Sequence, residues 1–239
     1  MINLSIIIPI YKEGKNIESL IDLITKNINV TDYEILFIDD NSEDGTEKIL
    51  KEINIQNKNV KYIIRKEKKK DLSKSCILGF ENSKFNNILV MDGDLQHDPN
   101  DINKLIKTFS EKNLDMVVGS RNLFNKKNEG LPFYRLASSK VLIILISIFL
   151  GKKTEDPMSG FFLFKKEIYL SRKEYLYAKG YKILLDLIYF TKKELKIADV
   201  DINFQSRAKG KSKMSIKIIL LVILIIIRKF FLKIKLSLN

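Results

Sequence analysis

The sequence predicts an α/β fold built on a mostly parallel sheet that helices cover on both faces. Short, continuous apolar runs, such as residues 6–8 and 35–38, are typical of strands that are buried on both faces. Between these runs, apolar residues recur at helical spacing. Alternation of strands and helices along a chain favours a parallel sheet.

Five buried strands are expected in the first half of the chain, at residues 6–8, 35–38, 62–64, 88–91 and 116–118. Helices are expected around residues 17–24 and, after a start at Pro99, around 102–109. In the second half we expect a very apolar helix over 136–150, a helix over 180–194 and a strand over 200–204. Ligands of parallel sheets bind beyond the carboxyl ends of the strands, so polar residues directly after the strands are the candidates for function.

The composition of the chain limits the kinds of partner that it could bind and the cellular compartment that it would suit. The 239 residues are 45% hydrophobic, which suits one large domain with an appendage, and the single cysteine, Cys76, fits a reducing environment. No secretory signal is recognised at the N-terminus, so we expect the bulk of the chain in the cytoplasm. The net charge of +13 would attract nucleic acid, anionic lipid or phosphorylated substrates. The basic run at residues 65–70 contains no aromatic residue, which argues against a nucleic-acid-binding protein.

Two apolar stretches, residues 141–150 and 218–227, indicate contact with a membrane. A spanning helix needs about 20 apolar residues, and both stretches are shorter. Lysine and arginine residues flank the second stretch, which is typical of a helix that lies in an anionic interface. The first stretch could equally be a core helix. We expect an interface helix near 136–150 and a basic, apolar membrane-associating segment over 214–239.

The strongest chemical signal follows the fourth predicted strand. Asp92 and Asp94 are separated only by Gly93, and two carboxylates at a strand end can share a divalent cation. Such a cation could bridge a diphosphate and neutralise the charge that develops on a leaving group.

Two further turns follow the first and second strands. Asp39 and Asp40 open a helix, where a carboxylate could accept a hydrogen bond from a nucleobase or simply cap the helix. Pro9, Tyr11 and Glu13 offer an aromatic face and a carboxylate that could flank a nucleoside.

Together these three turns resemble glycosyltransferase family 2, whose catalytic domain has the GT-A fold. The closer resemblance is to polyprenyl-phosphate (dolichol-phosphate) mannosyl- and glucosyltransferases. Further matching pieces are Gly119-Ser120-Arg121, Arg135, residues 156–162 and 180–182, and Phe204-x-x-Arg207-x-x-Gly210-x-Ser212-Lys213. The resemblance covers nearly all of residues 4–213, and we expect residues 1–213 to form the catalytic domain.

The resemblance implies a donor site, an acceptor site and a metal site. The donor-binding residues would be Pro9, Tyr11, Glu13, Ile38, Asp39, Asp40, Asp92, Gly93, Asp94, Gln96, Arg121, Lys182, Arg207 and Lys213. Asp94 and Gln96 would be the main ligands of Mg²⁺ or Mn²⁺, with Asp92 as a further candidate. Arg121, Arg135 and Arg207 would bind the acceptor phosphate and, with Asp94, are the implied catalytic residues.

The implied activity is inverting transfer of a hexose, with mannose favoured over glucose, from GDP-mannose or UDP-glucose to dolichyl or undecaprenyl phosphate. The protein would act at the cytoplasmic face of an anionic membrane, with a small membrane subunit as a candidate partner. A lipid phosphate is already anionic, so it needs positioning rather than a general base. In the alternative, a family 2 transferase uses Asp156 as the base for a hydroxyl acceptor. We expect the lone His97 to be structural.

Two segments depart from the pattern of the family. Lys12 stands where the family usually has Asn, and Asp71-Leu72-Ser73 replaces a usual Gly-Leu-Gly. The second change makes the loop less flexible. The chain has no Trp, so it lacks the Gln-x-x-Arg-Trp signature of processive polysaccharide synthases.

Overall fold

A seven-stranded sheet forms the centre of the described part of the chain, in the order β3-β2-β1-β4-β6-β5-β7. The computed structural model describes residues 2–121, 123–124, 133–189, 194–205 and 216–237, and for 133–135, 216–217 and 234–237 only the backbone is described. The strands are β1 (Leu4–Ile10), β2 (Tyr33–Asp39), β3 (Val60–Ile64), β4 (Asn87–Val90), β5 (Met116–Ser120), β6 (Phe162–Lys165) and β7 (Ile197–Asp201). All five strands expected in the first half of the chain are therefore confirmed.

The sheet is parallel except at β6, which lies antiparallel between β4 and β5. β6 was not predicted from the sequence. The strand expected at 200–204 was placed too late, because β7 pairs with β5 from Ile197↔Met116 to Asp201↔Ser120. Beyond it, Phe204 makes an isolated bridge to His97, which holds this segment against the loop that follows β4.

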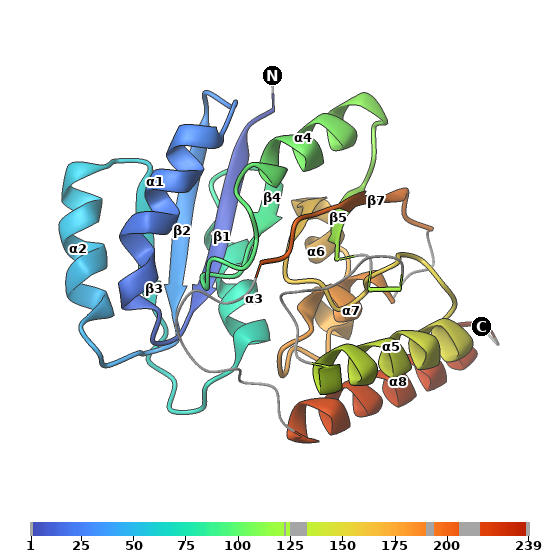
Figure 1. The fold of residues 1–239 in the computed structure, drawn as a ribbon. Coiled ribbons are helices and arrows are strands. Elements are labelled where there is room, and N and C mark those ends of the chain that lie inside the picture. Colours follow the sequence, from blue (N-terminus) through green and yellow to red (C-terminus); the bar gives the residue numbers. More distant parts are fainter. Residues whose placement is uncertain (1, 122, 125–132, 190–193, 206–215, 238–239) are drawn as a thin grey trace.

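Helices cover both faces of the sheet (Figure 1). They are α1 (Ile17–Asn27), α2 (Thr46–Gln56), α3 (Leu72–Asn82), α4 (Asp101–Glu111), α5 (Phe133–Leu150), α6 (Lys166–Leu170), α7 (Ile183–Ile188) and α8 (Ile216–Ser237), with 3₁₀ turns at Gly14–Asn16 and Lys173–Tyr175. One core joins α1, α2 and α4 to the sheet, and the other joins α3, α5, α7 and α8 to it. Alternate residues of β1 explain this division, because Ile6 and Ile8 face the first core and Ile7 faces the second.

Two helix boundaries differ from expectation. α4 begins at Asp101 with Asn100 at its N-cap, so Pro99 precedes the helix rather than starting it. α7 ends at Ile188 and is much shorter than the helix expected over 180–194, of which residues 190–193 lie outside the described part.

α5 and α8 lie side by side and run in the same direction beyond the carboxyl ends of the parallel strands (Figure 1). Each buries one face, with Leu142 and Ile146 of α5 and Val222 and Ile225 of α8 in the second core. Within the described residues, no helix is both long enough and apolar enough to cross a membrane. The expected boundary between residues 213 and 214 falls outside the described residues.

Candidate active site

A cavity of about 190 Å³ opens where the strands end, and many of the polar residues that follow the strands line it. β1 leads to Tyr11 and Glu13, β4 leads to the loop from Asp92 to His97, and β5 leads to Arg121. The cavity continues along α5 and α8, where Leu142, Ile218 and Val222 line it. Its remaining lining comes from Pro9, Ile10, Asp40, Lys70, Leu72, Ser75, Val90, Ser139, Met158, Ser159, Gly160, Phe162, Tyr181, Lys182, Ile183 and Phe204.

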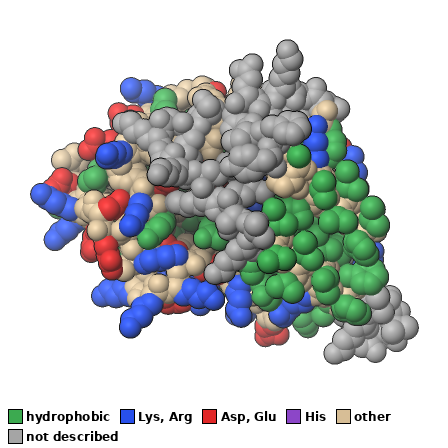
Figure 2. All heavy atoms as spheres, turned by 60° about the horizontal axis from the view of Figure 1, so that its bottom comes forward, with side chains coloured by type: hydrophobic (Ala, Val, Ile, Leu, Met, Phe, Trp, Pro, Cys, Tyr) green, Lys and Arg blue, Asp and Glu red, His purple; other side chains and the backbone are tan. Residues whose placement is uncertain are grey.

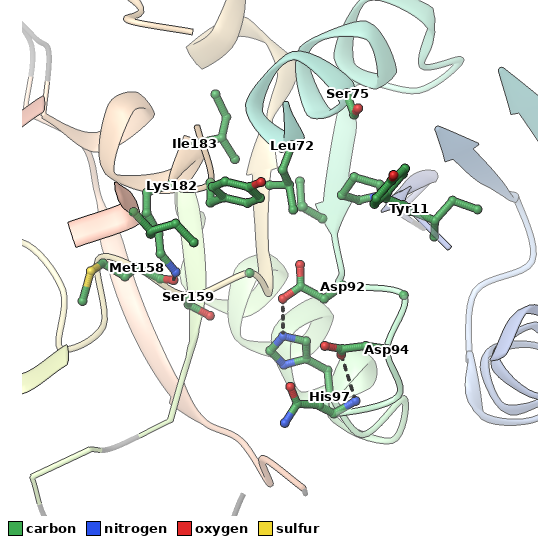
Figure 3. A pocket seen from close by; sticks show the side chains of 18 of the residues that line it. Tyr11, Leu72, Ser75, Asp92, Asp94, His97, Met158, Ser159, Lys182 and Ile183 are labelled. Atoms are coloured by element: carbon green, nitrogen blue, oxygen red, sulfur yellow. Dashed lines mark hydrogen bonds and ion pairs between the residues drawn. The ribbon is translucent and has the colours of Figure 1, made fainter. Parts of the chain in front are cut away.

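The loop after β4 turns back on itself and presents carboxylates to this cavity (Figure 3). Leu95 adopts a φ of 60°, and this left-handed conformation reverses the chain between Asp94 and Gln96. The backbone N–H of Gln96 donates to Asp94 Oδ1 over 3.2 Å. Asp94 is 7% exposed and Gln96 is 4% exposed, so both are buried in the wall of the cavity and do not lie on a solvated turn.

Asp92 points into the cavity between His97 and Lys182 (Figure 3). Its Oδ2 lies 3.4 Å from Nε2 of His97, which is within ion-pair range and at the outer limit of a hydrogen bond. Burial disfavours the charged carboxylate, but the contact with His97 and the positive charges of Lys182 and Arg121 outweigh burial and lower the pKa of Asp92. Asp92 is therefore ionised at neutral pH.

Gly160 allows Asp92 to occupy this position. A Cβ atom at residue 160 would lie 2.3 Å from Oδ2 of Asp92 and 2.6 Å from its Cγ, far inside van der Waals contact. The glycine in the matching segment 156–162 thus makes room for the first carboxylate of the acidic loop.

The side chain of Gln96 is oriented by the segment that follows β7. Its Nε2 donates to the backbone oxygen of Gln205 over 3.0 Å, and the N–H of Gln205 donates to the backbone oxygen of Gln96 over 2.9 Å. Because the amide nitrogen is committed to Gln205, Oε1 is the Gln96 atom that would ligate a cation.

The donor set fits a hard cation that is shared with a substrate. Among the residues whose placement is described, no group of three or more His, Cys, Asp and Glu side chains is arranged to hold a metal ion by itself. Asp94 and Gln96 supply oxygen atoms, with Asp92 nearby, and Mg²⁺ is commonly held by one or two carboxylates together with phosphate oxygens. A closed structural metal site would instead need a full set of protein ligands.

Arg121 forms a buried, bidentate ion pair with Asp156. Its Nε lies 2.6 Å from Oδ2 and its Nη2 lies 2.8 Å from Oδ1, and Asp156 is fully buried. Burial alone would raise the pKa of Asp156, but the charge and hydrogen bonds of Arg121 outweigh it, and the pKa is lowered. A carboxylate held in this way is a weak proton acceptor, so the geometry does not favour Asp156 as a general base.

His97 is buried between two aromatic rings. It is 1% exposed, and its ring centroid lies 5.1 Å from that of Phe161 and 5.2 Å from that of Phe204. It therefore lies in the cavity wall beside Asp92.

Asp40 lines the cavity, whereas Asp39 and Ile38 are not among its described lining residues. Asp39 accepts hydrogen bonds from the hydroxyl and the backbone N–H of Ser42, and thus shapes the turn after β2. Asp40 pairs with Arg65 and accepts the backbone N–H of Asp71 over 2.6 Å.

The two departures from the family pattern have clear structural settings. Asp71 is the N-cap of α3, where it accepts the N–H of Lys74 over 3.2 Å, and its two carboxylate oxygens also accept the N–H of Gly180 over 3.0 and 2.8 Å. The replacement thus ties the loop before α3 to the segment that carries Lys182. Lys12 has a φ of 58°, a conformation that Asn adopts more readily than Lys.

Three of the expected phosphate-binding residues fall outside the described structure. Arg207 and Lys213 lie in the stretch 206–215, and the side chain of Arg135 is not described. Of the remaining cations, Arg121 and Lys182 line the cavity. The contribution of α8 to the cavity was not predicted, because Ile218 and Val222 follow no motif and belong to an evenly apolar stretch.

Comparison with known proteins identifies the family. The family model described as "Glycosyl transferase family 2" matches residues 5–171. A dolichol-phosphate mannosyltransferase of Pyrococcus furiosus is 37% identical over 206 residues, covering 85% of this chain and 57% of the relative. A dolichol-phosphate mannosyltransferase of Mycosarcoma maydis is 27% identical over 192 residues, covering 77% of this chain and 64% of the relative. The chain thus spans less than two thirds of the length of either relative.

The fold also matches solved structures. A glucosyl-3-phosphoglycerate synthase of Mycobacterium tuberculosis, crystallised with Mn²⁺, UDP-glucose and phosphoglyceric acid, superimposes with a TM-score of 0.72 at 17% identity. The match covers 95% of this chain and 79% of that one, and it confirms the GT-A fold. Because the family model matches most of this chain, the chain belongs to glycosyltransferase family 2.

Proposed function

We propose that this chain transfers a hexose, mannose in preference to glucose, from a nucleotide diphosphate sugar to a polyprenyl phosphate such as dolichyl or undecaprenyl phosphate. One observation carries the proposal. A single cavity joins an acidic and cationic end at Asp92, Asp94 and Arg121 to an apolar end at Leu142 and Val222. A phosphate attached to a long hydrocarbon chain matches both ends.

The polar end suits the donor diphosphate. Asp94 and Gln96, with Asp92 as a third candidate, would hold Mg²⁺ or Mn²⁺, which when bound would neutralise charge on the departing diphosphate. Lys182 lies with its Nζ 3.0 Å from the backbone oxygen of Met158, and its charge acts on both Asp92 and Asp156. A point charge there would attract phosphate oxygens. The nucleoside would lie toward Tyr11, Glu13 and Asp40.

The acceptor phosphate would approach from the apolar end. One of its oxygen atoms would attack the anomeric carbon of the donor, while the bond from that carbon to the diphosphate breaks and the nucleoside diphosphate leaves with the electron pair. One displacement of this kind inverts the configuration. Because the attacking oxygen already carries negative charge, the step needs no proton acceptor, which agrees with Asp156 being engaged by Arg121.

The proposal also places the protein on the cytoplasmic surface of an anionic membrane. α5 and α8 share an exposed apolar face, formed by Val141, Ile144, Ile148, Phe149, Leu220, Leu224, Ile227 and Phe231 (Figure 2). Arg228 and Lys233 are exposed on α8, where they could contact lipid phosphates. A lipid acceptor could then pass from the bilayer into the cavity between these helices.

A reconstituted transfer assay tests the proposal. The protein is incubated with liposomes that contain polyprenyl phosphate, with Mn²⁺, and with radiolabelled GDP-mannose or UDP-glucose. We expect a labelled lipid, and we expect Asp94→Asn to abolish its formation. A parallel arm contains the unphosphorylated polyprenol. Transfer to the alcohol, or to no lipid at all with either donor, would refute the proposed acceptor.

A further inference from the structure

α8 carries a lysine whose side chain is buried, although lysines on surface helices are usually exposed. Lys229 is 1% exposed, and its Nζ lies 2.5 Å from Oδ1 of Asp186 on α7. The same ammonium group donates to the backbone oxygen of Asp186 over 3.1 Å and to that of Tyr175 over 3.4 Å. A buried charge is costly unless it is paired, and this pair joins α8 to α7.

Asp186 in turn holds the chain that leads into the cavity. Its Oδ2 accepts the backbone N–H of Ala178 over 2.9 Å, and its own N–H donates to the backbone oxygen of Lys182 over 3.3 Å. We call residues 178–183 the phosphate-facing segment. These two contacts close it into a compact turn. Lys182 of this segment lines the cavity, where its positive charge lies at the donor end.

The opposite side of the same segment is fixed by α3. Gly180 donates its N–H to Asp71, and its backbone oxygen accepts the N–H of Ser73 over 2.9 Å. The phosphate-facing segment is thus held between Asp71 on one side and the Asp186–Lys229 pair on the other. Loss of either attachment would leave the segment held from one side only.

We propose that Lys229 is a positioning residue for Lys182, and that α8 is consequently a working part of the active site rather than only an attachment to lipid. The role in transfer rests on the proposed function above. Its effect on the donor site does not, because binding of a nucleoside diphosphate can be measured without any acceptor.

The test compares nucleoside diphosphate affinity in matched variants by calorimetry, with GDP and UDP each titrated in the presence of Mn²⁺. Lys229→Met removes the buried charge, and Lys173→Met removes an exposed charge from the 3₁₀ turn Lys173–Tyr175, which Lys229 contacts. We expect Lys229→Met to weaken binding about tenfold, as a displaced binding group does, and Lys173→Met to leave it unchanged.

A double variant separates positioning from stability. Lys229→Met on its own leaves the Asp186 carboxylate buried without its partner, which would destabilise the fold. Lys229→Met with Asp186→Asn removes both charges and keeps an oxygen for the N–H of Ala178. We expect the double variant to recover the thermal midpoint of the wild type while nucleotide affinity stays about tenfold weaker.

Three outcomes would overturn the proposal. The double variant could bind nucleotide as tightly as the wild type, it could fail to recover its thermal midpoint, or the wild type could bind neither nucleotide. In the first two cases the ion pair would serve stability alone. If the wild type binds nucleotide but transfers no sugar to polyprenyl phosphate, the proposed acceptor fails while the positioning role of Lys229 stands.

Discussion

Replacing Gly160 by alanine tests how the site works, because the substitution should lower the catalytic rate and leave the stability of the fold nearly unchanged. The added Cβ would meet Oδ2 of Asp92 at 2.3 Å, and ordinary van der Waals contact begins at 3.4 Å. The carboxylate must therefore retreat by about 1.1 Å. The atom that moves is the end of a side chain that is 34% exposed, so it can turn into the cavity at little cost to stability.

A misplacement of about 1 Å in an active site can lower the rate by about a hundredfold. We therefore expect Gly160→Ala to lower kcat/KM by about a hundredfold, while the thermal midpoint changes by no more than about 2–4 °C. The assay is initial-rate transfer to lipid, with thermal unfolding followed on the same preparation.

The double variant Gly160→Ala with Asp92→Ala provides the control. If the glycine acts only through Asp92, the double variant should be no slower than Asp92→Ala alone, because the group that clashes is gone. Near-normal activity of Gly160→Ala, or losses that multiply in the double variant, would refute the reasoning.

Three other predictions follow from the same structure. Lys12→Asn should stabilise the protein by about 0.5–1 kcal/mol, because Asn tolerates the φ of 58° better than Lys, and a fall in the thermal midpoint would contradict this. The lowered pKa of Asp156 means that its ion pair stabilises the fold above about pH 4 and loses this effect as the pH falls through the folded-state pKa. Asp156→Asn should therefore cost about 3–5 kcal/mol at pH 7 in urea unfolding and should flatten the loss of stability in acid; an unchanged acid profile would argue against the pairing. Ile148→Asp and Phe231→Asp, on the exposed apolar face, should each weaken binding to anionic liposomes by about tenfold or more. Ile55→Asp, on α2 at a side chain that is 75% exposed, should leave liposome binding unchanged. Equal effects of all three substitutions would exclude this face as the membrane contact.

Local patterns were sufficient to predict the parallel core of the fold. Each of the first five strands is a short apolar run that ends in a polar turn, and the order of those turns placed Tyr11, Asp40, Asp94 and Arg121 at one edge of the sheet, where the structure brings them around one cavity. β6 was not predicted because it begins at Phe162, inside the segment 156–162, and that segment was interpreted as a motif and not as the start of a strand.

Long-range pairing could not be predicted from the sequence. Nothing near Lys229 in the chain indicates that it is buried, since its partner Asp186 is 43 residues away on a helix that was itself expected to be longer. The apolar stretch at 218–227 has little helical periodicity, so the face that lines the cavity, with Ile218 and Val222, could not be distinguished from the face that is exposed. Asp71 likewise suggested only a stiffer loop, whereas its carboxylate reaches Gly180, 109 residues later.

The loop after β4 is proposed to hold the donor diphosphate through a divalent cation, and the proposed function depends on this. Crystals soaked with Mn²⁺ and a nucleotide sugar, with data collected at the manganese absorption edge, test it directly. We predict an anomalous peak within coordination distance of Asp94 and of Oε1 of Gln96, with diphosphate oxygens completing the shell. A manganese peak and a nucleotide located away from both residues would contradict the account.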